Sequence, residues 1–435
     1  MKKIGKRLQI LCVGSIICSC LVAAALFYSC RKGGKSSSDH LGLIVFSDIH
    51  YLAPGLMTKG KTFNRYQVAS GRLAELSAPL WSVASSQILS YKENIVLICG
   101  DLSNNGERQS HVEFAQSLRE LERSGKWVFV VPGNNDIQNS RAEAYRGDTL
   151  FPVSTVNKND FAFIYSEFGY GEAISRDSSS LSYVARINRD NWLMALDLTY
   201  YDPATSQTKG AVKQETVDWI AQQLDKAKKQ KIRVIGMSHY GVVEHFDKQK
   251  SMFPTSLVED HRSLANFLAD KGVHILFTGH FHAMDITRFS SLNRNEFFEI
   301  ETGAMIASPF GFRRIELEET KMHVFTESLA DEKRINSVGY DPDSLYRKLM
   351  TSTCVSLLRR PPYSFNELLS ELTAPVVAEA MIAHYKGDEK PNPSVEAIIR
   401  MLKSLNVKTD MEYLHSLYLD LPPKDNRVIL ELPAD

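Results

Sequence analysis

Short apolar runs recur between residues 43 and 277, and polar residues follow each of them directly. The runs are rich in β-branched residues and are closed by Gly or polar residues, which predicts buried strands. Five such strands are expected, at 43–46, 95–99, 127–131, 234–237 and 273–277. In open α/β sheets the carboxyl ends of the strands form the ligand crevice. The polar residues that follow these runs are therefore expected to meet at one rim.

Apolar residues at helical spacing separate the predicted strands. Helices are expected at 63–91, 107–123, 214–231 and 261–271, the third with a Lys-rich solvent face. Pro79 interrupts the first of these patterns, so a kink or two helices are expected there. The alternation of strands and helices predicts right-handed crossovers and at least partly parallel pairing.

Additional strands make the predicted sheet a mixed one. Residues 181–187 alternate between apolar and polar side chains, and residues 192–196 form a more buried run, so the two are expected to pair antiparallel across the turn between them. Further strands that close the same domain are expected at 297–303, 312–317 and 322–325.

The pattern becomes helical beyond about residue 331. Helices are expected at 343–359, 365–385, 395–405 and 411–419. These changes in the sequence pattern divide the chain into three predicted parts. They are an export segment with its linker at 1–39, the main domain at 40–328 and a C-terminal helical extension at 329–435. The apolar stripes of the extension favour core packing, and a role as a lid is the alternative.

Basic residues between positions 2 and 7 precede an uncharged, mostly apolar run from 8 to 28, which is typical of a secretory signal. Residues 27–30, Phe-Tyr-Ser-Cys, resemble a loose bacterial lipoprotein signal, in which Cys30 would become a lipidated N-terminus. The alternative is an uncleaved anchor helix, because the run is about as long as a membrane span. We favour the lipoprotein interpretation. Both alternatives predict an exported domain that is anchored to the membrane at the cell envelope.

Composition narrows the choice of partners. The chain contains 51 Lys and Arg residues and 51 Asp and Glu residues, so it lacks the broad basic field expected of a nucleic-acid-binding surface. This balance is compatible with a small phosphate-bearing ligand.

Of six Cys residues, only Cys99 and Cys354 lie in the body of the protein, which excludes a disulfide framework or a CxxC zinc site. Cys99 ends a predicted strand and is expected to be a small buried apolar residue.

The polar clusters at the predicted rim combine carboxylates, imidazoles and an amide. They are Asp48-Ile49-His50, Gly100-Asp101, Gly133-Asn134-Asn135-Asp136, His239 and Gly279-His280-Phe281-His282. This mixture suits Mn, Fe or Zn better than Mg or Ca, because imidazole is a borderline nitrogen ligand. Two such ions about 3.5 to 4 Å apart acidify a bound water and clamp the attacking and leaving oxygens at phosphorus. The sequence contains no nucleophile elbow, Walker-type loop or GxGxxG motif that would compete with this interpretation.

The order Asp-x-His, Gly-Asp, Gly-Asn-x-Asp, His, Gly-His-x-His resembles the calcineurin-like metallophosphoesterase superfamily over residues 41–325. Residues 100–107 also resemble the second block of its bacterial secreted members. The resemblance implies an α/β fold, a four-layer αββα sandwich with mixed sheets, here followed by the helical extension. It also implies two divalent metal ions and their ligands. One ion would be held by Asp48, His50, Asp101 and His282, and the other by Asp101, Asn134, His239 and His280, with Asp101 bridging.

One position departs from the family pattern. The third block usually reads Gly-Asn-His followed by Asp or Glu, and its His is thought to help protonate the leaving oxygen or to hold the phosphate. Asn135 stands there in this chain, so the predicted catalytic set is Asp101, Asn135 and Asp136. An Asn cannot supply a proton, and general acid catalysis is worth about 10²- to 10⁴-fold. Substrates with acidic leaving groups are expected to react. The rate of hydrolysis is expected to be lowered most for simple alkyl phosphate esters.

These features predict a metal-dependent phosphoric ester hydrolase that attacks a phosphoester substrate with a metal-activated water, a phosphodiesterase rather than a phosphomonoesterase. The alternative is a domain that has lost turnover and serves as a metal-stabilised binding module at the cell surface. All seven candidate ligands are present, which favours the enzyme. Structural or surface roles are expected for His245, His261 and His274, whereas His111 and Tyr240 are expected near the rim.

Overall fold

The computed structural model describes residues 40–202, 208–329, 341–361, 363–405 and 413–433. Residues Leu41–Asp435 cluster as one compact unit, and Met1–His40 cluster separately. The predicted export segment at 1–39 lies outside the described residues. Among the helices that the structure describes, none combines the length and the apolar character needed to cross a membrane.

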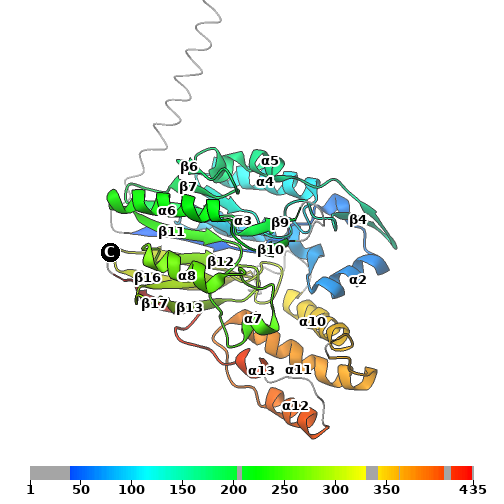
Figure 1. The fold of residues 1–435 in the computed structure, drawn as a ribbon. Helices are drawn as coiled ribbons and strands as arrows, with labels where there is room; N and C mark the ends of the chain where they lie inside the picture. Colours follow the sequence, from blue (N-terminus) through cyan, green and yellow to red (C-terminus); the bar gives the residue numbers. More distant parts are fainter. Residues whose placement is uncertain (1–39, 203–207, 330–340, 362, 406–412, 434–435) are drawn as a thin grey trace, which may run out of the picture. The chain divides into compact units, whose positions relative to one another are not determined.

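The first of two large sheets has six strands (Figure 1). Their order is β17 (Arg427–Glu431), β16 (Lys321–Ser328), β15 (Gly311–Leu317), β1 (Leu41–Phe46), β2 (Ile95–Cys99) and β3 (Trp127–Val131). The pairs β1–β2 and β2–β3 are parallel, whereas β15 pairs antiparallel with β1 and β16. The sheet is therefore mixed, as predicted. The parallel half places the ends of β1, β2 and β3 along one edge.

The second large sheet has seven strands. Their order is β13 (Asp285–Ser290), β14 (Glu296–Glu301), β12 (Ile275–Thr278), β11 (Arg233–Ser238), β8 (Asn191–Leu196), β7 (Tyr183–Arg186) and β6 (Ser175–Arg176). The central strands β8, β11, β12 and β14 run parallel, and β7 pairs antiparallel with β8, which confirms the predicted pairing. Two small antiparallel sheets join β4 (Glu143–Arg146) to β5 (Thr149–Pro152) and β9 (Thr199–Tyr201) to β10 (Thr208–Gly210).

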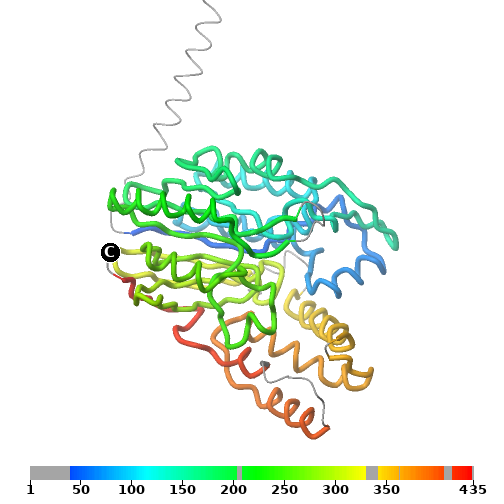
Figure 2. Tube along the Cα trace, viewed as in Figure 1, coloured from blue at the N-terminus to red at the C-terminus, as the bar shows by residue number. Residues whose placement is uncertain are grey.

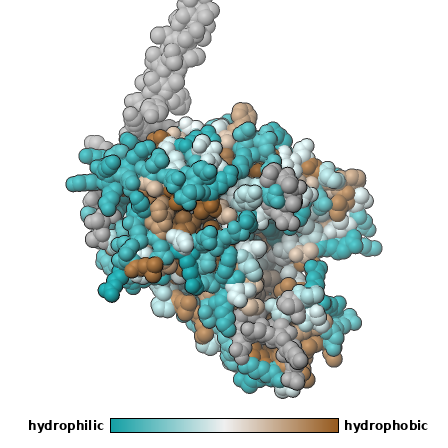
Figure 3. Space-filling view, in the orientation of Figure 1, coloured by the Kyte–Doolittle hydropathy of each residue, from teal (hydrophilic) through white to brown (hydrophobic). Residues whose placement is uncertain are grey.

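The alternation of side chains along β11 shows how the layers pack. Ile235 and Met237 belong to the core that the second sheet shares with the first. Val234, on the opposite face, packs in a separate core with the helices α6 (Gln214–Lys229) and α8 (His261–Asp270). Because successive strand residues point to opposite faces, this arrangement buries both faces of the sheet. The exposed side of α6 carries the predicted lysines, and Figure 3 shows hydrophilic residues over this helix, with hydrophobic patches elsewhere on the same face.

Helices also cover the outer face of the first sheet, where α3 (Ser77–Ser90) and α4 (Arg108–Arg123) share its core. The break predicted at Pro79 occurs earlier in the chain. Helix α2 (Lys61–Ser70) ends at Gly71, which adopts the left-handed conformation with φ of 67°, and Pro79 lies in the first turn of α3, where a missing N–H costs little. The remaining short helices are η1 (Pro54–Leu56), η2 (Ala74–Leu76), α5 (Lys158–Ile164), η3 (Ser166–Tyr170) and α7 (Gln249–Met252).

These layers confirm the predicted α/β sandwich with mixed sheets and C-terminal helices. Those helices are α10 (Pro342–Leu358), α11 (Glu367–Lys386), α12 (Pro393–Ser404) and α13 (Tyr413–Ser416). Their buried apolar residues join the core of the first sheet, and α10 contacts α2. The extension is not purely helical, because the chain then returns to the first sheet, where β17 pairs antiparallel with β16 (Figure 2). Cys99 and Cys354 are both free and buried, and the burial of Cys99 agrees with the prediction of a small buried apolar residue.

Candidate metal centre

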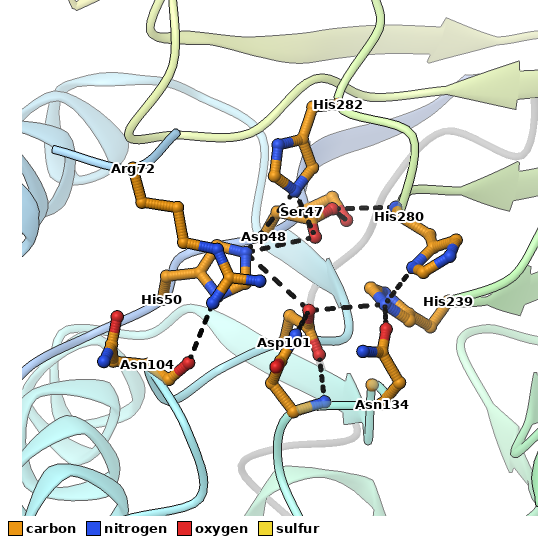
Figure 4. A network of polar contacts seen from close by, with 12 residues as sticks. Ser47, Asp48, His50, Arg72, Asp101, Asn104, Asn134, His239, His280 and His282 are labelled. Carbon is orange, nitrogen blue, oxygen red and sulfur yellow. Dashed lines mark hydrogen bonds and ion pairs between the residues drawn. The ribbon is translucent and has the colours of Figure 1, made fainter. Parts of the chain in front are cut away.

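The seven predicted ligands converge at one rim, because each of them follows a strand that ends there (Figure 4). Asp48 and His50 follow β1, Asp101 follows β2 and Asn134 follows β3, all from the first sheet. The second sheet contributes the remaining three, His239 after β11 and His280 and His282 after β12. The geometry predicted from the strand pattern is therefore present, with the two sheets contributing ligands from both sides of the rim.

One half of the centre is formed by Asp48, His50 and His282. The Nε2 atoms of the two histidines lie 3.4 Å apart. Asp48 Oδ1 lies 3.5 Å from His50 Nε2 and 3.2 Å from His282 Nε2. Asp101 Oδ2 lies 3.7 Å from His50 Nε2, so this carboxylate borders the group. Oxygen and nitrogen atoms thus face one small volume.

The other half is formed by Asn134, His239 and His280. His239 Nε2 lies 3.0 Å from Asn134 Oδ1 and 3.2 Å from His280 Nδ1. The same nitrogen lies 3.6 Å from Asp101 Oδ2. Asp101 therefore lies between the two halves, in the place that a bridging carboxylate occupies.

Hydrogen bonds behind the centre fix which nitrogen of His239 and which nitrogen of His280 faces it. His239 Nδ1 lies 2.9 Å from the Cys99 carbonyl, and His280 Nε2 lies 3.0 Å from the Thr255 carbonyl. Because a carbonyl oxygen can only accept, each of these ring nitrogens must donate. The opposite nitrogen of each neutral ring then presents its lone pair to the centre, as in a metal-ligating histidine.

Burial and neighbouring charges favour the metal-binding protonation states of His50, His280 and Asp48. His239 differs, because burial would lower its pKa but Asp101 and Asp48 outweigh burial and raise it. Burial lowers the pKa of His280 to about 3, with a further contribution from the charge of His239. Burial also lowers the pKa of His50 to about 4. For Asp48, burial would raise the pKa, but His282 and His239 outweigh this effect and hold it well below its usual range. Neutral imidazoles and ionised carboxylates are the forms that bind metal.

The residues present fit a pair of divalent cations. Asp48 Oδ1 is buried without a hydrogen-bond partner, although Oδ2 of the same carboxylate accepts from the Ser47 hydroxyl and the His280 amide. Facing imidazole nitrogens and an unpartnered carboxylate oxygen are costly in a buried site unless a cation is present. The donor set of imidazoles, carboxylates and an amide oxygen suits first-row transition metals and zinc.

The backbone at the centre is unusual. Asp48, His50, Asp101, His280 and His282 all have positive φ angles, between 46° and 78°. This region is uncommon for residues other than glycine, costs about 1 kcal/mol or more for each of them, and is concentrated at functional sites. The strand-end pattern identified these residues but gave no sign of their conformation.

Close backbone approach explains the glycines that precede several ligands. A Cβ at Gly133 would lie 2.2 Å from Asp101 Oδ1, and a Cβ at Gly279 would lie 1.7 Å from Ser47 Oγ. Any side chain at either position would therefore displace the residues that hold the ligands.

Asp136 acts on the ligand-bearing loops rather than facing the centre. Its Oδ2 accepts from the amides of Gly133 and Leu102, and its Oδ1 accepts from the amide and hydroxyl of Ser103. Burial raises its pKa to about 7, with a further contribution from Asp101. Both oxygens are occupied by the loops after β2 and β3, so we interpret Asp136, which was predicted to be catalytic, as a positioning residue.

The histidine and tyrosine expected near the rim lie in different places. His111 is fully buried behind the rim, where its Nδ1 pairs with the Tyr165 hydroxyl and its Nε2 with the Asp136 carbonyl. Tyr240 does border the centre, since its ring lies 4.1 Å from the His280 ring between centroids. His111 therefore stabilises the loop that carries Asp136, whereas Tyr240 limits the movement of the His280 ring.

His245 links the two loops that carry the histidines of the second sheet. Its Nε2 lies 3.0 Å from Glu299 Oε1, and its Nδ1 lies 2.7 Å from Glu301 Oε2. Glu299 also accepts from the amide of Val242, in the loop after His239, and Glu301 accepts from the amide of Ala283, next to His282. Burial alone would lower the pKa of His245, but Glu301, Asp285 and Glu299 raise it well above its usual value. A charged imidazole thus joins two buried carboxylates.

Replacing His245 with glutamine is expected to destabilise the fold by about 3 to 5 kcal/mol, because it leaves buried carboxylates without their cation. Metal affinity is expected to fall by about 10- to 100-fold, the range for residues that orient metal ligands. Chemical denaturation and metal titration measure the two effects. The control is His323→Gln, since His323 forms a partly exposed pair with Glu318 that should contribute less than about 1 kcal/mol. Equal losses in the two variants would contradict the assignment.

Residues 41–284, more than half of the chain, match the family model described as calcineurin-like phosphoesterase. Among solved structures, the chain is similar to a dimetal phosphatase from Danio rerio, with 16% identity, a TM-score of 0.49 and coverage of 66% of this chain and 96% of that chain. It is also similar to purple acid phosphatase PPD1 from yellow lupin seeds, with 12% identity, a TM-score of 0.44 and coverage of 68% and 52%. No curated protein matches the chain.

Proposed function

Because this chain belongs to the calcineurin-like phosphoesterase family, we propose that its metal centre hydrolyses phosphoester substrates. The observation that carries the proposal is the convergence of carboxylate, imidazole and amide ligands around Asp101. Two divalent ions held there would acidify a bound water and stabilise negative charge on the transferring phosphoryl group. We propose Mn, Fe or Zn as the ions, because the donor set includes four imidazoles.

The roles of the ligands follow from their grouping. Asp48, His50 and His282, with Asp101, would hold one ion. Asn134, His239 and His280, with Asp101, would hold the other. Asp136 would keep the loops of Asp101 and Asn134 at a fixed distance, since it binds amides from both.

We further propose that the substrates are phosphodiesters or other phosphoesters with acidic leaving groups. Asn135 supports this proposal, because its amide can donate a hydrogen bond but cannot supply the proton that a poor leaving group needs. Its Nδ2 lies 2.5 Å from Asp101 Oδ2, and its backbone amide donates to Asp101 Oδ1 at 2.8 Å. The side chain is therefore held at the edge of the centre, where a substrate phosphate would lie.

Hydrolysis of bis(p-nitrophenyl) phosphate and p-nitrophenyl phosphate tests the proposed activity. The purified protein is expected to hydrolyse the diester after addition of Mn, to lose activity in a chelator and to regain it when metal is restored. Bound metal without hydrolysis of either ester would instead favour the binding module, for which the loss of the usual proton donor at Asn135 is the supporting observation.

We also propose that residues 1–39 export the protein and anchor it through a lipid on Cys30. In a bacterial host, palmitate labelling is expected for the wild-type chain and is expected to disappear in Cys30→Ser. Unlabelled wild-type protein in the membrane fraction would favour the anchor helix, and unlabelled protein in the soluble fraction would contradict both forms of anchoring.

A further inference from the structure

Two arginines border the metal centre without belonging to its ligand set. Arg72 lies in the turn between α2 and η2, is half-buried and donates from Nη1 to the Asn104 carbonyl at 3.1 Å. Figure 4 draws Arg72 on the side of the centre where His50 and Asn104 lie, opposite His239.

Arg141 reaches the centre from the loop after β3. Its Nη2 donates to Asn135 Oδ1 at 3.2 Å, and its backbone amide donates to Asn139 Oδ1 at 2.9 Å. Asn139 in turn donates to the Asn135 carbonyl at 3.2 Å. These bonds tie the loop together and connect Arg141 through Asn135 to Asp101.

Neither guanidinium has a carboxylate partner within the part of the chain that the structure describes, although Arg108, Arg288 and Arg314 all form ion pairs there. A guanidinium has five N–H donors in a planar fork, so one bond to Asn104 or Asn135 leaves most of them for a ligand. Two divalent ions would outweigh the carboxylates of Asp48 and Asp101. Each arginine therefore adds positive charge that no described side chain balances.

We infer that Arg72 and Arg141 bind the leaving group of a substrate whose scissile bond joins two phosphates. The inference rests on the proposed phosphoesterase activity and narrows its substrate class. Guanidinium groups match phosphate oxygens in a bidentate manner. They also stay protonated at any pH at which the protein is folded, so they stabilise a leaving anion without protonating it. This property complements Asn135, which cannot act as an acid.

The chemical step is balanced without a proton donor for the leaving group. The oxygen of water bonds to the attacked phosphorus, and the bridging P–O bond breaks. The leaving phosphate departs with the electron pair of that bond, held by the two guanidinium groups. The proton released by the water passes to solvent.

Two substrates with acidic leaving groups distinguish binding of a leaving phosphate by the arginines from a general contribution of the arginines to hydrolysis. They are P1,P2-di(adenosine) diphosphate, whose leaving group is a phosphate, and bis(p-nitrophenyl) phosphate, whose leaving group is a phenolate. In Arg72→Gln and in Arg141→Gln, kcat/KM for the diphosphate is expected to fall about 10- to 100-fold, as for the loss of a charge-assisted hydrogen bond. For bis(p-nitrophenyl) phosphate the loss is expected to be several-fold smaller than for the diphosphate, since its leaving group has no phosphate charge to bind.

Matched controls come from arginines close by in the chain. Arg65 is exposed on α2 and bonds only to the Thr62 hydroxyl among the described contacts, and Arg146 is exposed on β4 and bonds to the Gly55 carbonyl. The variants Arg65→Gln and Arg146→Gln should leave both substrates unaffected. Equal losses on the two substrates in the Arg72 and Arg141 variants, or no loss on the diphosphate, would overturn the inference.

An equilibrium binding measurement tests the role of the two arginines without requiring hydrolysis. Calorimetric titration of the metal-loaded protein with imidodiphosphate, whose P–N–P link resists hydrolysis, is expected to show binding that weakens about 10-fold or more in each arginine variant. If the wild type hydrolyses neither substrate, the proposed function fails, and this titration still decides the inference. Unchanged affinity for imidodiphosphate in both variants would contradict the inference.

Discussion

Replacing Asp101 with asparagine is expected to lower kcat for every phosphoester substrate by about 10³-fold or more. Asp101 is buried between the two halves of the centre, 3.7 Å from His50 Nε2 and 3.6 Å from His239 Nε2. The substitution preserves the shape of the side chain but removes the charge that both ions would share. Stabilisation of transition-state charge by bound metal is worth several kcal/mol, and each 1.36 kcal/mol is a factor of ten in rate.

Steady-state kinetics at saturating Mn, together with thermal unfolding, measures this effect. The matched control is Asp197→Asn, because Asp197 is also buried and accepts backbone hydrogen bonds but lies outside the ligand set. The control is expected to keep its metal and to change kcat by less than about tenfold, since it removes no group that interacts with the transition state. A folded Asp101→Asn protein with kcat within tenfold of the wild type would show that Asp101 is not the shared ligand.

Installing histidine at position 135 is expected to change selectivity rather than overall activity. For simple alkyl phosphate esters, Asn135→His should raise the rate by about 10²- to 10⁴-fold, because it supplies a general acid for a poor leaving group. For aryl esters the rate should stay within about tenfold, since a phenolate leaves without a proton. Asn135 is buried and fixed by its contacts with Asp101 and Arg141, so the new imidazole would be held close to the phosphate.

The measurement is the slope of log(kcat/KM) against the pKa of the leaving group, for wild type and Asn135→His. The slope is expected to be steep for the wild type and shallower for the variant. Asn139→His is the control, because Asn139 lies in the same loop but bonds to Asn135 and not to Asp101. A folded Asn135→His variant that binds metal and retains the wild-type slope would contradict the role assigned to this position.

The sandwich and the grouping of the ligands could be predicted because both depend on short-range patterns. Runs such as 95–99 and 234–237 are rich in β-branched residues, and the residue that follows a parallel strand must lie at the rim. The positive φ angles of Asp48 and His282 could not be predicted, since Asp and His are enriched in this conformation among residues other than glycine but still adopt it only rarely. The convergence of residues from different strands on the metal centre imposes this backbone conformation. That constraint comes from the tertiary structure and not from the local sequence.

The features that were missed depend on contacts between distant segments. A structural or surface role is expected for His245 from the sequence, but its partners Glu299 and Glu301 lie on β14, far along the chain, so the sequence gives no sign of these contacts. Strand β17 was missed because most of its residues are at least partly exposed, as expected for an edge strand whose apolar signal is weak. Asp136 follows Asn135 directly, yet its side chain turns toward the amides of Leu102 and Gly133. Position in the motif alone does not reveal this direction.

Metal content is the most direct test of the proposed centre. The purified protein is loaded with Mn, Zn or Fe, freed of unbound metal and analysed by mass spectrometry for metal per chain. Two ions per chain are expected for the wild type with at least one of these metals, as for two-metal phosphoesterase sites. In Asp101→Asn, which removes the proposed shared ligand, the content is expected to fall to about one ion or fewer. A wild-type protein that retains no more metal than Asp101→Asn would contradict the dinuclear centre.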